Sequence, residues 1–233
     1  MKNIKLIYIL PNLFTALSVF FGMMSIIASS QEKFEKAFIY IILSFIADGL
    51  DGRVARMTNT SSKFGLEFDS LADIVAFGVA PAMMLFFSIG TNYGKFGALI
   101  TGLFVVFGAI RLARFNVTTS QNDPSVFIGL PIPTAAAVLA SIIMLNLELH
   151  NSLNFIILIF SFILGILMVS NVRFPSFKKI DLHQNAKLKV LIVIIILASL
   201  LYLYPIWTLS ITLTGYILYG LVRWSWSLKK IYK

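Results

Sequence analysis

Apolar runs of membrane-spanning length fill most of this sequence. Eight of them follow one another with only short polar stretches between them, and each holds about the 20 residues that a helix needs to cross a bilayer. We predict helices for all of them, because an open strand edge cannot satisfy its backbone hydrogen bonds in hydrocarbon. The runs lie at residues 8–29, 36–57, 66–89, 95–115, 127–147, 152–170, 187–204 and 206–226.

The composition excludes a water-soluble globule. Hydrophobic residues make up 58% of the 233 positions and charged residues only 12%, whereas soluble chains are about 25% charged. Little sequence remains outside the runs, so no second, soluble domain fits. We therefore expect an all-α, polytopic membrane helix bundle that forms a single domain over residues 1–233. We expect about eight transmembrane helices, within a range of six to eight, because only Tyr204–Pro205 separates the last two runs.

Lysine and arginine fall almost entirely on one side of this arrangement. With the N-terminus in the cytoplasm, 16 of the 19 lie on the inner side, and only Lys33, Lys36 and Lys95 lie on the outer side. This is the positive-inside pattern of membrane proteins. It predicts a protein of the cell membrane with both termini in the cytoplasm. The net charge of +9 then forms an inner rim that faces anionic lipid head groups, not a nucleic-acid site.

Four aspartates lie where the hydropathy pattern places the membrane. Asp48 and Asp51 are near the inner end of the second run, and Asp69 and Asp73 are near the inner end of the third. Spacings of three and four residues put each pair on one helix face. A charged side chain at the bilayer centre costs about 2.5–3.5 kcal/mol, so four unpaired carboxylates need compensation.

The short turn around residues 59–63 brings the two helices back antiparallel, so we expect the four carboxylates to converge. Oxygen ligands suit hard divalent cations such as Mg²⁺ or Mn²⁺. Four carboxylates are enough for two ions that share ligands, an arrangement that commonly serves phosphoryl-type transfer. The chain has no cysteine and only two, distant histidines, which argues against other metal sites. The alternative is a set of helix-cap aspartates paired with Arg53, Arg56 and Lys63.

Small and polar residues surround the aspartates. Gly52 and Gly65 permit close approach of a phosphate or nucleotide to the backbone, and Ala55 keeps the same helix face small. Arg56 can bridge phosphate oxygens with two N–H groups, and Ser62 adds a hydroxyl donor. Small residues in membrane helices more often serve close packing. Their spacing relative to the acids favours a phosphate site.

Residues 48–73, across the second and third runs, resemble the signature of the CDP-alcohol phosphatidyltransferase family. Its eight fixed positions are all present, namely Asp48, Asp51, Gly52, Ala55, Arg56, Gly65, Asp69 and Asp73. The resemblance implies a homodimeric membrane enzyme that displaces CMP from a CDP-linked lipid with an alcohol, using divalent metal at the aspartates. Asp48, Asp51 and Asp69 would then be metal ligands, and Asp73 both a ligand and the general base. The nucleotide and its diphosphate would contact Gly52, Ala55, Arg56, Ser62 and Gly65.

Two further segments resemble the membrane-bound branch of this family whose acceptor alcohol is L-serine. They are Gly108–Asn116, at the end of the fourth run, and Gly129–Thr134, at the start of the fifth. The substrates implied are CDP-diacylglycerol and L-serine. Arg111 or Arg114 would hold the serine carboxylate, with Asn116 beside them.

Residues 10–15 fit the same branch. There the resemblance implies that Asn12 and Thr15 line the nucleotide pocket, although a Pro-Asn pair at a helix start ordinarily serves capping.

Two alternatives stay open. Glycerol 3-phosphate and inositol phosphate also need cations, so Arg111 and Arg114 alone do not separate these acceptors from serine. Positive-inside anchoring also explains arginines at this position. Outside the family, carboxylates within spans mark ion pathways, which makes an ion or metal transporter the rival function. The acids gather at one helix end and no inverted repeat is visible, which favours the enzyme.

Overall fold

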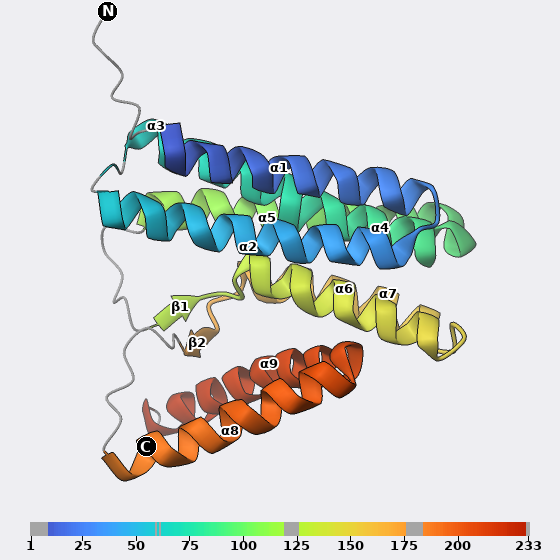
Figure 1. The fold of residues 1–233 in the computed structure, drawn as a ribbon. Coiled ribbons are helices and arrows are strands. Elements are labelled where there is room, and N and C mark those ends of the chain that lie inside the picture. Colours follow the sequence, from blue (N-terminus) through green and yellow to red (C-terminus); the bar gives the residue numbers. More distant parts are fainter. Residues whose placement is uncertain (1–8, 59, 61, 119–125, 176–183, 232–233) are drawn as a thin grey trace, which may run out of the picture.

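The computed structural model describes residues 9–58, 60, 62–118, 126–175 and 184–231. Long helices dominate these residues and lie with their axes roughly along one direction (Figure 1). Each predicted apolar run holds helix, so the helical class is confirmed. The α-helices are α1 (Ile9–Ser30), α2 (Phe34–Thr58), α3 (Lys63–Asp73), α4 (Ala80–Ser88), α5 (Gly94–Thr118), α6 (Ile132–Glu148), α7 (Asn154–Val169), α8 (Gln184–Leu203) and α9 (Pro205–Ile231).

The third predicted run is one continuous helical rod built from three pieces. A π-helical segment, η2 (Ile74–Val79), joins α3 to α4 without a break. A 3₁₀ turn, η3 (Gly90–Tyr93), then leads directly into α5. π-helical turns inside α-helices are rare and occur frequently at functional sites. This one begins at the residue after Asp73.

Four helical stretches of the described chain are long and apolar enough to cross a membrane. They are Ile9–Ser30, Lys63–Ser88, Gly90–Thr118 and Pro205–Trp226. The apolar helices Ile132–Glu148, Asn154–Val169 and Val190–Leu203 are shorter. The protein therefore has the helices of an integral membrane protein, while the count of about eight transmembrane helices stays a prediction.

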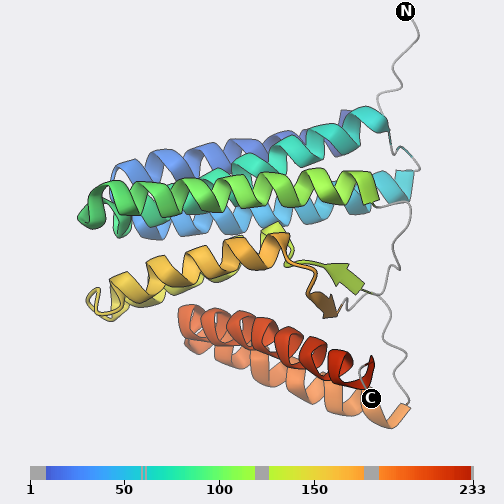
Figure 2. The ribbon, with the colours of Figure 1, turned by 180° about the vertical axis from the view of Figure 1, so that it is seen from behind.

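The helices form three layers around a core at α6. Figures 1 and 2 show α1 to α5 packed together, α6 and α7 beside them, and α8 with α9 on the far side. Most of α6 is buried, and Ala135, Leu139 and Ile143 are fully inaccessible. The π-helical segment also lies in the core, where Ala76 and Phe77 have no exposed surface. The rod that carries two of the aspartates is thus fixed from several sides.

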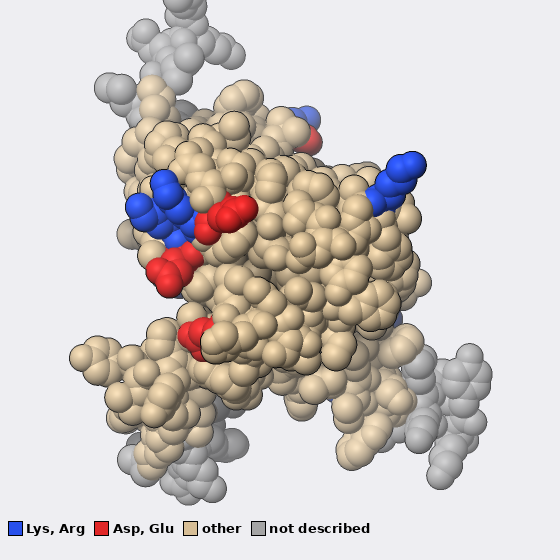
Figure 3. Space-filling model, turned by 90° about the vertical axis from the view of Figure 1, so that its right-hand side faces the viewer, with Lys and Arg blue, Asp and Glu red and all other residues tan. Residues whose placement is uncertain are grey.

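Charged side chains separate into two groups at opposite ends of the bundle. The beginning of α1, the end of α2, the end of α5 and the end of α9 lie at one end (Figure 1). The described cations predicted for the inner side lie toward that end, namely Arg53, Arg56, Lys63, Arg111, Arg114, Arg173 and Arg223. The opposite end shows few charges (Figure 3). Among its described residues, Lys33, Lys36 and Lys95 are balanced by Glu32, Glu35 and Glu148.

The fifth predicted run differs from the structure at its start. Residues 126–128 form a strand, β1 (Val126–Ile128), that pairs antiparallel with β2 (Arg173–Pro175), and α6 begins only at Ile132. The prediction of helix from residue 127 was therefore wrong. Gly129 adopts φ +76°, which favours glycine, and Pro131 stands at the N-cap position of α6. The two short strands pair with each other along one edge at the end of the bundle.

Gly97 marks the closest approach between α5 and the 3₁₀ turn before it. A Cβ atom at Gly97 would overlap the carbonyl group of Gly90, whereas one at Gly102 on the same helix would meet nothing within 4 Å. We expect Gly97→Ala to lower the melting temperature in detergent, because overpacking typically costs about 1–3 kcal/mol. Gly102→Ala should leave it unchanged or raise it, since alanine is the better helix former. Equal melting temperatures for the two variants would contradict the close packing.

Candidate active site

Three carboxylates from two helices meet at the inner-rim end of the bundle. Asp48 and Asp51 project from the last turns of α2, and Asp69 projects from α3. One oxygen from each lies within 4.8 Å of the other two, which is close enough for a single cation to bind all three. The spacing of the aspartates along the sequence had predicted this convergence.

Asp73 lies one helical turn beyond Asp69 and is partly buried. Its carboxyl group is close enough to Asp48 to share a hydrogen bond, so the fourth carboxylate joins the same cluster. Its Oδ1 atom is buried and has no hydrogen-bond partner among the described residues. A buried oxygen without a partner is costly, and a bound cation or a substrate proton would satisfy it.

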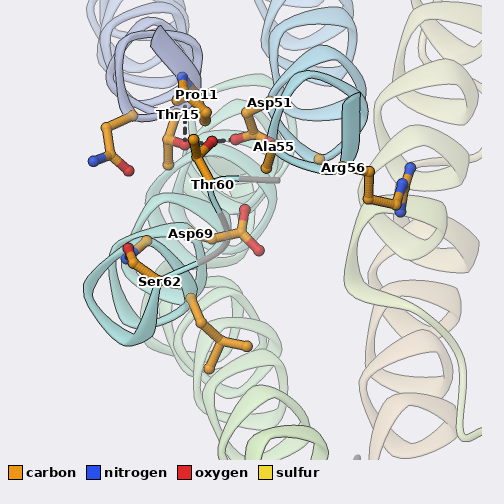
Figure 4. Close-up of a pocket in the computed structure, with 12 residues that line it drawn as sticks. Pro11, Thr15, Asp51, Ala55, Arg56, Thr60, Ser62 and Asp69 are labelled. Atoms are coloured by element: carbon orange, nitrogen blue, oxygen red, sulfur yellow. Dashed lines mark hydrogen bonds between the residues drawn. The ribbon is translucent and has the colours of Figure 1, made fainter. Parts of the chain in front are cut away.

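Two local features hold the carboxylates in place. Thr15 of α1 donates a hydrogen bond of 2.6 Å from Oγ1 to Oδ2 of Asp51, which is only 7% exposed (Figure 4). Ser62 is the N-cap of α3, and its Oγ accepts a hydrogen bond of 3.0 Å from the backbone N–H of Gly65. The cap starts α3 immediately after the short connection from α2. Helix α1 packs against both aspartate-bearing helices, and their carboxylates meet beside it.

A cavity of about 240 Å³ opens beside Asp51 and Asp69. All seven residues that the sequence predicts as nucleotide contacts line it, namely Asn12, Thr15, Gly52, Ala55, Arg56, Ser62 and Gly65. The sequence analysis missed three further lining residues, Pro11, Thr60 and Leu66. Thr60 is 6% exposed and lies in the α2–α3 connection, where no helical periodicity marks which side chains face inward.

The Cβ-free backbone at Gly65 keeps one wall of this cavity open. A Cβ atom there would lie 3.2 Å from Ser62 Oγ and 3.3 Å from Asn12 Oδ1. Arg56 lies at the rim and is exposed, and its side chain extends away from Asp51 and Asp69 (Figure 4). In this conformation Arg56 neutralises none of the acids, so its guanidinium is available to a ligand.

The acceptor residues predicted on α5 fall into three different settings. Arg111 is 7% exposed, stacks 5.1 Å above the ring of Phe115, and interacts electrostatically with Asp73. Arg114 is hydrogen bonded to backbone carbonyl groups. Asn116 donates a 2.9 Å hydrogen bond to Ser70 Oγ, between the two aspartates of α3. Arg111 and Arg114 both line a second cavity of about 210 Å³.

The arrangement fits a divalent cation better than helix capping. Across the described residues, no lysine or arginine forms a salt bridge with any of the four aspartates, so the predicted alternative of pairing with Arg53, Arg56 and Lys63 is not what the structure shows. The donors are all carboxylate oxygens, which are ligands that Mg²⁺ and Mn²⁺ prefer. Asp48, Asp51 and Asp69 provide the candidate metal site, and Asp73 adjoins it.

Comparison with known proteins gives the same picture. The chain is 48% identical over 228 residues to a CDP-diacylglycerol–serine O-phosphatidyltransferase of Helicobacter pylori, covering 97% of this chain and 94% of that protein. A protein of the same name from Methanocaldococcus jannaschii is 38% identical over 178 residues, covering 76% and 79%. An archaetidylserine synthase of Methanothermobacter thermautotrophicus is 35% identical over 176 residues, covering 75% and 72%.

The family match spans the helices that build the site. Residues 8–167 match the family described as CDP-alcohol phosphatidyltransferase, from the beginning of α1 to near the end of α7. This range holds the four aspartates, the cavity beside them and the arginines of α5. The chain belongs to the CDP-alcohol phosphatidyltransferase family.

Proposed function

We propose that this protein transfers the phosphatidyl group of CDP-diacylglycerol to the hydroxyl of L-serine and releases CMP and phosphatidylserine. The observation that carries the proposal is the carboxylate cluster, which opens on one side to a cavity lined by all seven predicted nucleotide contacts. The buried Arg111 of α5, which lines a second cavity, interacts electrostatically with Asp73. We place the donor in the first cavity and the acceptor beside Arg111. Relatives that match nearly the whole chain carry the name of this activity.

The nucleotide half of the donor binds in the cavity beside Asp51. The small residues Gly52, Ala55 and Gly65 let the diphosphate approach the backbone. Arg56 supplies N–H donors to the diphosphate oxygens, and Ser62 supplies an O–H donor. Asn12 and Thr15 contact the nucleoside from α1. The acyl chains stay in the bilayer, because the cavity lies at the end of helices whose outer faces are apolar.

Asp48, Asp51, Asp69 and Asp73 would hold Mg²⁺ or Mn²⁺, as two ions that share ligands. Bound there, divalent metal neutralises the diphosphate and stabilises the negative charge that develops on CMP. The chain's own part is to hold four carboxylates in a fixed cluster, which Thr15 and the Ser62 cap support.

The acceptor enters from the side of Arg111. This guanidinium binds the serine carboxylate and leaves the serine hydroxyl near Asp73. Asp73 accepts the hydroxyl proton while the oxygen attacks the phosphorus attached to diacylglycerol. The bond between that phosphorus and the bridging oxygen breaks, and the oxygen departs on CMP. Asn116 holds Ser70, and thereby the aspartate face of α3, against α5.

The membrane orientation completes the proposal. The cationic end of the bundle faces the cytoplasm in the cell membrane, where the charge bias of the sequence places it. The active site lies at this end and so draws both substrates from the cytoplasmic side. The family resemblance further implies a homodimer.

Asp73→Asn is expected to abolish turnover, because the amide cannot accept the hydroxyl proton. The loss in kcat should be at least about 10²-fold, the lower end for general base catalysis. Radiolabelled CMP release from CDP-diacylglycerol, with and without serine, measures it. Glu67→Gln is the matched control, since Glu67 is an exposed acid on the same helix. Full activity of Asp73→Asn would remove Asp73 from the mechanism.

Metal removal is expected to destabilise the protein as well as to stop catalysis. A chelator should lower the melting temperature of the wild type, and Mg²⁺ or Mn²⁺ should restore it, because a ligand bound only to the folded state stabilises it. At 100 times the dissociation constant the gain is about 2.7 kcal/mol. Asp69→Asn should lose most of this metal response and Glu67→Gln should keep it. A response of equal size in both variants would place the metal elsewhere.

An acceptor series tests the serine assignment. Purified protein with CDP-diacylglycerol should release CMP on addition of L-serine, and far more slowly with glycerol 3-phosphate or inositol phosphate. Mass spectrometry of the lipid product identifies the transferred head group. If CMP release depended on a different alcohol, the serine assignment would fail while the family assignment remained. Ion flux into vesicles without any CMP release would favour a transporter instead.

A further inference from the structure

Arg114 donates most of its hydrogen bonds to backbone carbonyl groups of the protein itself. Its Nη1 donates to the carbonyl oxygen of Val169 at 2.8 Å and to Oδ1 of Asn171 at 3.3 Å. Its Nη2 donates to the carbonyl oxygens of Ser170 at 2.9 Å and Ile128 at 3.3 Å. These acceptors lie on β1, at the last residue of α7 and on the chain that follows it. One side chain thus ties the end of α5 to two segments that are distant in the sequence.

These contacts leave Arg114 without a pair of parallel N–H groups that could bind a ligand. A guanidinium has five N–H groups, of which four are on the two terminal nitrogens. All four terminal N–H groups of Arg114 have an acceptor in the protein. A carboxylate bound in bidentate fashion needs two parallel N–H groups. Arg114 can supply them only by giving up bonds that hold the site together.

The surrounding backbone is shaped to accept this guanidinium. Gly129 has φ +76°, and a Cβ atom there would lie 2.8 Å from Arg114 Nη2 and 3.1 Å from the carbonyl oxygen of Ser170. Gly129 N also donates a 2.8 Å hydrogen bond to the carbonyl oxygen of Val172, and Ile128 pairs with Arg173 in the β1–β2 ladder. The contacts of Arg114 are therefore built into the fold.

Arg111 is the contrasting case in the same cavity. It is 7% exposed, and its buried Nε has no hydrogen-bond partner among the described residues. It lines the cavity of about 210 Å³ together with Arg114, Phe115 and Phe127, and it interacts electrostatically with Asp73. Among the described residues that line this cavity, Arg111 and Arg114 are the only cations. Of the two guanidinium groups, only that of Arg114 is tied to the backbone by hydrogen bonds between described residues.

We infer that Arg114 is a positioning residue and that Arg111 is the one guanidinium of the acceptor site that is free to bind an acceptor. A site with one such cation selects an acceptor that bears a single carboxylate over one that bears a phosphate dianion. The inference rests on the proposed function and deepens it. A phosphate dianion beside the aspartates needs at least a second cation. The second guanidinium of this cavity, that of Arg114, binds backbone carbonyl groups of the protein instead. Serine brings one carboxylate, which one guanidinium neutralises.

A double-mutant cycle on the full-length enzyme tests the inference. The variants are Arg111→Gln, Arg114→Gln and both together, and the measurements are kcat, KM for serine, KM for CDP-diacylglycerol and melting temperature. Arg111→Gln should raise the serine KM at least tenfold without changing the melting temperature. Arg114→Gln should lower the melting temperature and raise the serine KM three- to tenfold, with the KM for CDP-diacylglycerol unchanged. If Arg114 acts through Arg111, the double variant should have the serine KM of Arg111→Gln alone.

The contrary results are distinct. If the increase in serine KM in the double variant equalled the product of the two single increases, and Arg114→Gln left the melting temperature unchanged, Arg114 would be a direct ligand. That result would overturn the inference. Arg114→Lys repeats the test if the glutamine variant does not fold. Lysine keeps the charge but lacks the fork, so it should resemble Arg114→Gln, whereas rescue of the serine KM would again indicate a direct ligand.

Competition with glycerol 3-phosphate tests the charge argument separately. In the wild type it should not compete with serine at equal concentration, and competition there would overturn the single-cation site. Absence of any serine-dependent CMP release by the wild type would instead overturn the proposed function itself.

Discussion

The mutual repulsion of four carboxylates in a water-poor helix bundle is the constraint on which the site depends. Oxygens of Asp48, Asp51 and Asp69 lie within 4.8 Å of one another, and Asp73 adjoins them. At an effective dielectric constant of about 20, two like charges 4 Å apart repel by about 4 kcal/mol. The described lysines and arginines form no salt bridge with the cluster. The one hydrogen bond from the Thr15 hydroxyl group cannot offset several such repulsion energies. A cation bound among the carboxylates would offset this repulsion, and the geometry of Asp48, Asp51 and Asp69 allows one to bind.

The surroundings of the cluster divide the chemistry between two cavities. The cavity beside Asp51 and Asp69 is framed by glycine, alanine and hydroxyl side chains, which suits a diphosphate and a nucleoside that must approach the backbone. The second cavity is lined by two arginines and two phenylalanines, which suits a small anionic acceptor. In the proposed reaction the carboxylates serve both cavities, because Asp51 and Asp69 line the first and Asp73 interacts electrostatically with Arg111, which lines the second.

Helical periodicity explains which parts of this site the sequence could predict. Asp48, Asp51, Asp69 and Asp73 lie on regular helices, so their spacing alone determines a common face, and the residues at fixed offsets from them line the cavity as expected. Thr60 was missed because it lies in a connection without periodicity. The β1–β2 pair was missed because three-residue strands carry no pattern, and because a run of apolar residues at 127 looks like the start of a span. The contacts of Arg114 join segments 14 and 55–57 residues away, a distance over which single-sequence patterns carry no information.

The C-terminal helices add support to the acceptor side without taking part in the carboxylate cluster. The family match ends at residue 167, before β2, and α8 and α9 line neither of the two cavities. Yet α9 packs against β2: Tyr216 donates a 3.1 Å hydrogen bond to the carbonyl oxygen of Pro175, and a side chain at Gly220 would overlap the buried ring of Phe174. Strand β2 pairs with β1, and β1 supplies a carbonyl group to Arg114. Helix α9 thus supports β2, β2 pairs with β1, and β1 contacts Arg114 at the end of α5, where Arg111 also lies. We therefore expect changes in α9 to alter binding at the proposed acceptor site through this connection, and to leave the proposed metal and nucleotide sites on α1 to α3 as they are.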